Sequence, residues 1–339
     1  MYAEARVLES DKSQRTSVAQ SNRISLNHEA LTHLIAWLLT ALDYYSQIQQ
    51  EGKQFSGGFQ HHKREIQLGS SFQISKANVL KFVGKLWKIE HTKFGSTKDY
   101  SLNFQGFMNK NNPKADEAPH PLFAEVNVTA LISRIRTIPA FMKLLDNYVA
   151  SVGVPETRTS EHEEEIQSFL SEIMKTDVLK ETRKFLEQEG MRFTSEADFL
   201  HFFEQLWFAP YKRRRQNDSS AFEHVFVGEK KGSEVSGFHN WIQFLRLERT
   251  GVLDYQGYFA KQCGDPPRVA TLAFRMQDGS TKPRGSMLLG TSPEFEMALY
   301  TVIFLSRHKH FNVQLDSCKA VVTCHPTQGG SYIGTCYIK

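Results

Sequence analysis

The sequence predicts an α+β fold, with an N-terminal helical lobe followed by a β-rich C-terminal lobe of antiparallel sheets. Two observations support this class. Apolar residues recur at helical spacing in residues 76–215, whereas short strand-like runs broken by Gly and Pro fill residues 216–339. Helices that precede strands, instead of alternating with them, are typical of α+β proteins. We therefore expect a helical lobe over 76–215 and a β-rich lobe over 216–339.

Residues 1–75 are expected to form an extension ahead of this fold. A polar leader precedes the apolar run 31–42, which predicts one amphipathic helix, and the Gln-, Gly-, His- and Lys-containing stretch 47–69 is expected to be a linker. The apolar run is too short and too interrupted to span a bilayer, and the charged first residues are unlike a secretory leader. We expect a soluble monomer without membrane contact, cytoplasmic or nuclear in preference to secreted.

Helix-start signals divide the helical lobe. Ser160 and Glu163 have the spacing of a capping box, and Pro139 lies near the first helical position after Thr137. The helix from Thr137 is expected to end near Gly153, and the stripe after Ser160 is expected to continue to residue 190. The four predicted helix starts are Ser75, Thr137, Ser160 and Ser195.

The C-terminal lobe contains one clear helix among its strands. Ser292 can cap it, Pro293 takes its first position, and Glu294 and Glu296 favour its positive end. Just before this lobe lies a basic run at 212–215, which is either a solvated helix end or a surface that contacts phosphates. The predicted strands are residues 224–227, 269–276, 286–289, 313–315, 320–323 and 332–338.

Composition restricts the class of function only weakly. Hydrophobic residues make up 40% of the 339 residues, enough for one large core or two smaller ones. The net charge of +4 permits a nucleic-acid partner, because such binding needs only a local basic groove. Four cysteines lie in the last quarter of the chain at spacings that match no zinc ribbon or CxxC pair. Disulfides and free buried thiols both remain open.

Two histidines of the C-terminal lobe are candidates for chemistry. His224 and His239 lie on either side of one hairpin-like connection, so two strand-borne imidazoles could face a shared cleft. Cleavage of RNA by its own 2′-hydroxyl needs one imidazole as base and one imidazolium as acid. Lys282, in a Gly- and Pro-bounded loop, could stabilise the charge that develops on the phosphate.

Longer stretches around these residues resemble the EndoU (XendoU) family of uridylate-specific endoribonucleases, which is related to the uridylate-specific endoribonuclease of coronaviruses. The resemblance is carried by SSAFEHVFVGE, VSGFHNWIQFL and KPRGSMLLGTSPEFEMALYT, and it runs in family order over roughly residues 76–339. It implies an EndoU-like fold whose β-rich lobe is catalytic. It also implies cleavage of single-stranded, U-rich RNA at uridines, leaving 2′,3′-cyclic phosphate and 5′-hydroxyl ends.

The resemblance assigns roles to the three candidate residues. His239 matches the general base, His224 the general acid, and Lys282 the residue that stabilises the phosphate. Glu223 and Glu229 match acidic positions that the family needs, and they could orient the histidines, raise their pKa values or recruit a cation.

Three further residues match substrate-binding positions. Ser286 matches a contact to the uracil edge, Tyr337 an aromatic ring that packs on the sugar or base, and Thr335 lies nearby. Ser286 could instead end a turn, and Tyr337 could belong to the core. The resemblance also implies a manganese or calcium ion, for which the sequence locates no ligands.

Two other functions remain open at this stage. The first is a catalytically inactive RNA-binding module of the same fold. The second is a nuclease that uses a metal-activated water, which would need a cluster of ligands that the sequence does not reveal.

Overall fold

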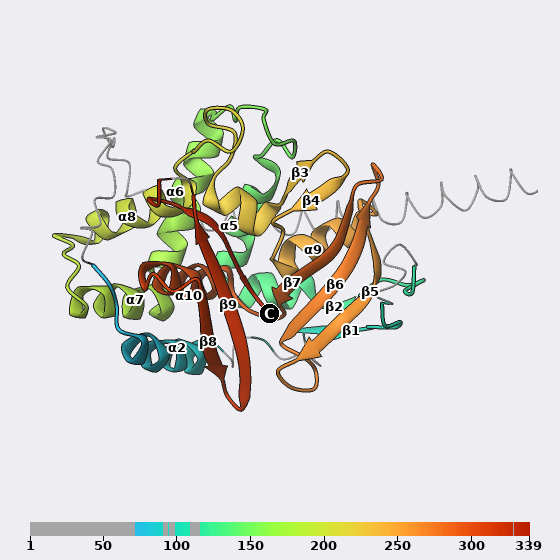
Figure 1. Ribbon diagram of the computed structural model, residues 1–339, viewed down its shortest axis with the longest axis horizontal. Helices are drawn as coiled ribbons and strands as arrows, with labels where there is room; N and C mark the ends of the chain where they lie inside the picture. The colour runs from blue at the N-terminus through green and yellow to red at the C-terminus, as the bar shows by residue number, and fades with distance from the viewer. Residues whose placement is uncertain (1–71, 91–93, 95–98, 109–115, 328) are drawn as a thin grey trace, which may run out of the picture.

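A computed structural model describes residues 72–90, 94, 99–108, 116–327 and 329–339. The extension predicted over 1–75, with its helix and linker, therefore lies outside the described residues except for its last four positions. The predicted class is confirmed: helices dominate the first part of the chain and sheets the last part (Figure 1). The boundary expected at residue 215 stays a prediction.

The first part contains seven helical segments among the described residues, together with a small antiparallel sheet. The helices are α2 (Lys76–Glu90), α4 (Val128–Arg134), α5 (Thr137–Lys143), the 3-10 turn η1 (Leu144–Asp146), α6 (Ser160–Met174), α7 (Asp177–Gln188) and α8 (Glu196–Phe208). The two paired strands are β1 (Tyr100–Leu102) and β2 (Phe123–Val126).

The second part contains two sheets and two α-helices. The elements of this second part are the π-helical turn η2 (Glu223–Val227), β3 (Glu229–Lys231), β4 (Glu234–Ser236), α9 (Trp241–Arg249), β5 (Leu253–Gln262), β6 (Val269–Met276), β7 (Thr281–Leu288), α10 (Pro293–Leu305), β8 (His310–Leu315), β9 (Cys318–Pro326) and β10 (Ile333–Ile338). The five-stranded sheet has the order β3-β4-β7-β6-β5, in which only β4 and β7 run parallel. The three-stranded sheet is antiparallel and has the order β10-β9-β8.

Helix α10 is the centre of the hydrophobic core. Every one of its residues is buried, and it contacts α2, α5 and α7 on one side and β9 and β10 on the other. Its start follows the sequence prediction, since the Ser292 side chain accepts from Phe295 N and Pro293 is the first helical residue. Figure 1 shows this helix between the group of α-helices and the three-stranded sheet, with the five-stranded sheet beyond.

Some predicted helix limits are wrong. The helix that begins at Thr137 changes to a 3-10 turn and ends at Asp146, well before Gly153. The cap of α6 is Thr159, whose hydroxyl accepts from His162 N at 3.2 Å, so Ser160 is already helical. The stripe that follows belongs to two helices, because the Thr176 side chain caps α7.

The strand predicted over 224–227 is also wrong. These residues form η2, in which Gly228 N donates to Glu223 O at 2.8 Å, the spacing of a π turn. The Ser220 hydroxyl accepts from Glu223 N at 3.1 Å at the start of the turn. All five residues of η2 are buried, Glu223 and His224 included, so the rest of the protein encloses this helical turn.

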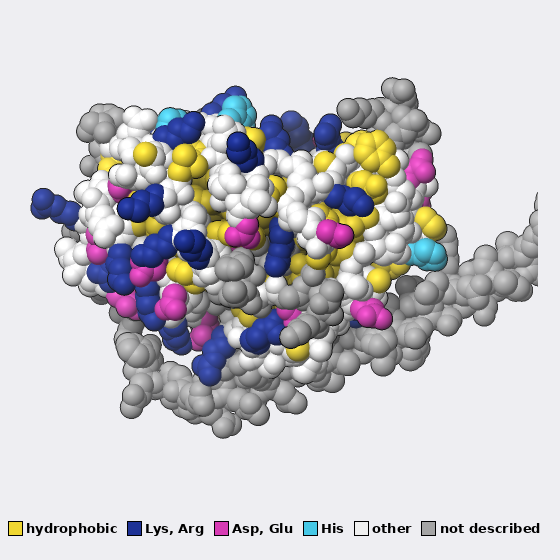
Figure 2. Space-filling model, turned by 90° about the horizontal axis from the view of Figure 1, so that it is seen from below, with side chains coloured by type: hydrophobic (Ala, Val, Ile, Leu, Met, Phe, Trp, Pro, Cys, Tyr) yellow, Lys and Arg dark blue, Asp and Glu magenta, His cyan; other side chains and the backbone are white. Residues whose placement is uncertain are grey.

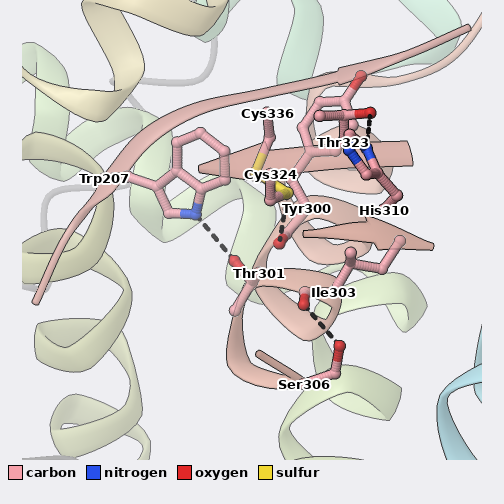
Figure 3. The surroundings of a disulfide bond; sticks show 9 residues. All are labelled: Trp207, Tyr300, Thr301, Ile303, Ser306, His310, Thr323, Cys324 and Cys336. Atoms are coloured by element: carbon pink, nitrogen blue, oxygen red, sulfur yellow. Dashed lines mark hydrogen bonds between the residues drawn. A yellow bond between two sulfur atoms is a disulfide. The ribbon is translucent and has the colours of Figure 1, made fainter. Parts of the chain in front are cut away.

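All four cysteines form disulfide bonds. Cys324 and Cys336 join the neighbouring strands β9 and β10 beside Tyr300 of α10, as Figure 3 shows. Cys263 and Cys318 join the end of β5 to the start of β9, and this bond therefore links the two sheets. The structure thus decides between the disulfides and free thiols that the sequence left open. Among the described residues, no helix is long and apolar enough to cross a membrane.

Candidate active site

Two backbone hydrogen bonds bring the histidine-bearing segments together. Phe238 N donates to His224 O at 2.9 Å, and His239 N donates to Val225 O at 2.7 Å. The chain returns to η2 through the hairpin of β3 and β4, so the expected hairpin is present. Neither histidine, however, lies in a strand: His224 is part of η2, and His239 precedes α9.

Gly237 permits this close approach. It has a positive φ of 66°, and a Cβ atom at this position would lie 1.8 Å from His224 O. Any side chain would therefore push the two segments apart. The next residue, Phe238, also has a positive φ of 64°, a conformation that costs a non-glycine residue about 1–2 kcal/mol. Its fully buried ring packs on Phe274 of β6.

The hydrogen bond of His239 fixes its tautomer. Its Nδ1 lies 2.9 Å from the carbonyl oxygen of Ser286, and because a carbonyl only accepts, Nδ1 carries a proton. In the neutral ring, Nε2 is then free to accept a proton. Burial, together with the positive charge of Lys282, holds the pKa of His239 well below its ordinary value. The ring stacks on Tyr337 with 5.0 Å between centroids.

His224 is held by a carboxylate. Its Nδ1 lies 2.6 Å from Glu229 Oε2, so Nε2 is again the nitrogen left for a substrate. Burial lowers the pKa of His224, and the hydrogen bond to Glu229 offsets only part of this effect. Burial alone would raise the pKa of Glu229, but the contact with His224 and the charge of Arg213 outweigh it, so this carboxyl is ionised.

Arg213 forms an ion pair with the carboxylate of Glu229. Its Nε lies 3.0 Å from Glu229 Oε1, and its guanidinium also donates to Gly334 O of β10 at 2.5 Å and to the Tyr211 hydroxyl at 2.8 Å. One residue of the basic run 212–215 is therefore turned inward, whereas its neighbours in the run are exposed. Sequence reasoning missed this role, because only the fold brings β10 beside Arg213.

Lys282 lies in β7 and not in the loop that the sequence predicted, and its positive charge lowers the pKa of both histidines. Its side chain is 8% exposed, and Nζ donates to Val235 O at 3.1 Å. Gly285 leaves room for it, since a Cβ there would lie 3.2 Å from Lys282 Cγ and Cε. Burial lowers the pKa of Lys282 to about 8, and Glu234 partly opposes this. The amine is therefore mainly charged at neutral pH.

The proposed substrate-binding residues border the same place. Ser286 lies inside β7 and does not end a turn; its Oγ is 3.0 Å from Thr271 Oγ1. Tyr337 is half-buried against His239. Thr335 also belongs to β10, and within the described part of the chain its buried Oγ1 has no hydrogen-bond partner.

Glu223 is placed differently from Glu229. It is buried, and burial together with the charges of Glu229 and Glu156 raises its pKa to about 9, so its carboxyl is protonated at neutral pH. Glu156 shares a side-chain hydrogen bond with it. Glu229 thus holds His224, whereas Glu223 belongs to a neighbouring carboxyl pair.

No metal site can be assigned to this region. Across the described ranges, no three His, Cys, Asp or Glu side chains converge in a way that could hold an ion.

Comparison with known proteins identifies the family. A family model described as endoribonuclease XendoU matches residues 78–338, which is most of the chain. The chain belongs to the XendoU endoribonuclease family.

Relatives of this XendoU-family protein agree with the assignment. Uridylate-specific endoribonuclease C of Danio rerio is 37% identical over 286 residues, covering 80% of this chain and 90% of that protein. Poly(U)-specific endoribonuclease-A of Xenopus laevis is 36% identical over 271 residues, covering 76% and 91%. The solved structure of XendoU, titled a splicing independent snoRNA processing endoribonuclease, matches with a TM-score of 0.66 at 37% identity, covering 77% of this chain and 96% of that one. The chain is thus an RNA-cleaving enzyme of the uridylate-specific endoribonuclease family.

The role of Gly237 can be tested against Gly232, which has nearly the same φ (65°) in the β3–β4 turn but no atom near its Cβ position. Gly232→Ala should lower the free energy of unfolding by about 1–2 kcal/mol through the backbone conformation alone. Gly237→Ala should lower it further and abolish RNA cleavage. Urea unfolding and a cleavage assay measure both, and equal behaviour of the two variants would contradict the close-approach argument.

The proximity of Lys282 to both histidines predicts a change in titration. The ammonium group disfavours a second positive charge, so Lys282→Met should raise the pKa of His239 and of His224. NMR titration of the imidazole rings measures this. Lys309→Met is the matched control, because Lys309 lowers the pKa of His325 instead. If the control shifts His239 equally, the effect is not local.

Proposed function

We propose that this enzyme cleaves single-stranded RNA on the 3′ side of uridines by transesterification. The 2′-hydroxyl of the uridine attacks the neighbouring phosphorus, and the products carry a 2′,3′-cyclic phosphate and a 5′-hydroxyl. The observation that carries this proposal is the pairing of His224 and His239. Each imidazole is held through Nδ1 by an acceptor, so both present Nε2 to a substrate beside Lys282.

His239 is suited to act as the base. Burial and the charge of Lys282 keep its ring neutral, and the Ser286 carbonyl keeps the proton on Nδ1. Nε2 can then take the proton of the 2′-hydroxyl as that oxygen attacks the phosphorus.

His224 is suited to act as the acid. In the free protein its pKa is lowered, chiefly by burial, but the ionised Glu229 favours the charged ring. The negative charge of a bound phosphodiester adds to that effect, so substrate binding and protonation support one another. The imidazolium then donates its Nε2 proton to the departing 5′-oxygen.

Lys282 stabilises the transition state. A pentacoordinate phosphorus carries more negative charge than the phosphodiester, and a fixed ammonium in a partly desolvated place favours the more charged species. Val235 O accepts from Nζ and so orients it, and the pKa of about 8 keeps most of the charge at neutral pH.

Uridine selection is assigned to Ser286, Thr335 and Tyr337. The relatives are named uridylate-specific or poly(U)-specific, which supports the same preference here. Ser286 is half-buried, the Oγ1 of Thr335 is unpaired among the described residues, and the Tyr337 ring stacks beside the catalytic His239. The Ser286 hydroxyl can accept from or donate to a base edge, and the Tyr337 ring can cover a base face.

The face of the molecule seen in Figure 2 carries many basic side chains. Figure 2 shows Lys and Arg side chains spread over the face seen from below, between exposed hydrophobic side chains. Such a distribution attracts a polyanion weakly at each place, so recognition depends on the local site.

A monomeric state and dependence on manganese or calcium remain part of this proposal, on the strength of the family resemblance.

Loss of either histidine should remove turnover. His224→Ala and His239→Ala should each slow cleavage of a U-containing oligoribonucleotide by a factor on the order of hundreds or more, because each removes one proton-transfer partner. His120→Ala, which alters an exposed histidine, is the matched control and should cleave normally. Near-normal cleavage by either active-site variant would show that the roles are wrong.

The nature of the cut ends tests the chemistry itself. Cyclic phosphate should be the first product, and replacing the uridine by 2′-deoxyuridine should prevent cleavage while leaving binding intact. Linear phosphate as the first product would favour a metal-activated water, and binding without any cleavage would favour an inactive RNA-binding module. Repeating the assay with a chelator and then with manganese or calcium tests the metal.

A further inference from the structure

Phe259 of β5 is an aromatic side chain that the core does not use. It is half-buried, and among the described residues its ring packs neither on the hydrophobic core cluster nor on another aromatic ring. The register of β5 against β6 skips it, because Tyr258 pairs with Leu272 and Ala260 pairs with Thr271. Phe259 is therefore the extra residue of a β-bulge, a feature that redirects a side chain.

The group that contacts this ring is Arg284. Its guanidinium carbon lies 5.1 Å from the centroid of the Phe259 ring, which is within cation–π distance. Arg284 is exposed, and within the described ranges it forms no hydrogen bond or ion pair. The pair thus presents a positive, planar group to solvent, without a carboxylate to neutralise it.

Phe259 and Arg284 lie on the same face of the sheet as Ser286. The register of β7 against β6 shifts between Lys282 and Gly285, so regular alternation holds only from Gly285 onward. Gly285 is buried, whereas Arg284 is exposed and Ser286 is half-buried, which places Arg284 on the Ser286 face at a spacing of about 7 Å. Phe259 must project from that face as well, because it contacts Arg284. Thr271, which lies between them on β6, bonds to Ser286 Oγ and pairs with Ala260 beside Phe259. The surface is therefore continuous from Ser286 to Phe259.

The order of strands gives this surface a direction relative to the cleaved bond. Lys282 Nζ contacts Val235 of β4, so the phosphate site lies on the β4 side of β7. Phe259 lies on β5, at the opposite edge of the sheet. The scissile phosphate is on the 3′ side of the uridine. With the uridine at Ser286 of β7, RNA that continues past this uridine towards β6 and β5 is its 5′ side.

We propose that Phe259 and Arg284 form a second base-binding subsite, which stacks the nucleotide on the 5′ side of the cleaved uridine. The inference rests on the proposed function, since it takes Ser286 as the uracil contact. A base stacks on an aromatic ring or on a guanidinium plane without regard to its identity. The subsite therefore increases affinity for longer single strands and adds little sequence preference.

The test compares a substrate that reaches the subsite with one that does not. The trinucleotide ApUpA has a 5′ neighbour, whereas the dinucleotide UpA has none. Phe259→Ala should lower kcat/KM for ApUpA by a factor on the order of ten and leave kcat/KM for UpA unchanged. Wild-type enzyme should lose the same advantage when the 5′ adenine is replaced by an abasic ribose.

Two further variants separate stacking from charge and from general damage. Arg284→Lys keeps the positive charge but removes the plane, so it should also lower kcat/KM for ApUpA selectively. Phe107→Ala is the matched control: this ring is 56% exposed and packs on Tyr258, away from the Ser286 face. It should cleave both substrates like the wild type.

A binding measurement keeps the subsite testable apart from cleavage. With 2′-deoxyuridine in place of uridine, the trinucleotide cannot react, and Phe259→Ala should weaken its binding by a similar factor. Equal effects of Phe259→Ala on the long and short substrates, or none on either, would overturn the subsite. If the wild type cleaves neither substrate, the proposed function fails, while the binding result still decides whether the subsite exists.

Discussion

The candidate active site depends on one close backbone contact, which η2 makes with the segment before α9. Two hydrogen bonds hold these segments together, and they form only because Gly237 has no side chain to collide with His224 O. The positions of both imidazoles follow from this contact, since each belongs to one of the paired segments. The buried ring of Phe238 then anchors the junction in the core, which makes the distance between the histidines a property of the backbone.

Electrostatics determines how this site behaves before RNA arrives. Two imidazoles and an ammonium group lie near one another in a largely buried place, and Glu229 is the ionised carboxylate in contact with His224. Burial and the positive charge of Lys282 lower the pKa of both rings, which are therefore neutral near pH 7, and burial lowers the pKa of Lys282 to about 8. A bound phosphodiester would place additional negative charge beside these groups. Such a site favours an anionic ligand, because added negative charge would favour the protonated forms of the histidines.

The sequence predicted what depends on local chemistry. Ser292 and Pro293 mark the start of α10 because capping acts within one turn, and the fold class followed from periodicity. Residues 224–227 were misassigned because a short apolar run fits a buried strand and a buried helical turn equally well. The candidate residues came from motifs, but the tautomer of His239 and the inward turn of Arg213 needed the fold, since their partners are distant in sequence. The cysteine pairing was equally inaccessible, because four cysteines allow three connectivities.

The bond between Cys263 and Cys318 has a consequence for the unfolded chain. Its two ends are 55 positions apart, and β6, β7, α10 and β8 lie between them. In the chain-entropy account, closing a ring of this size raises the free energy of the denatured ensemble by about 4 kcal/mol. Lys282 and Ser286 lie between the two bonded cysteines, so the disulfide keeps β7 tethered to the start of β9 even in the denatured chain. The covalent link therefore reduces the number of conformations that the chain must search before β7 and the three-stranded sheet pack together again.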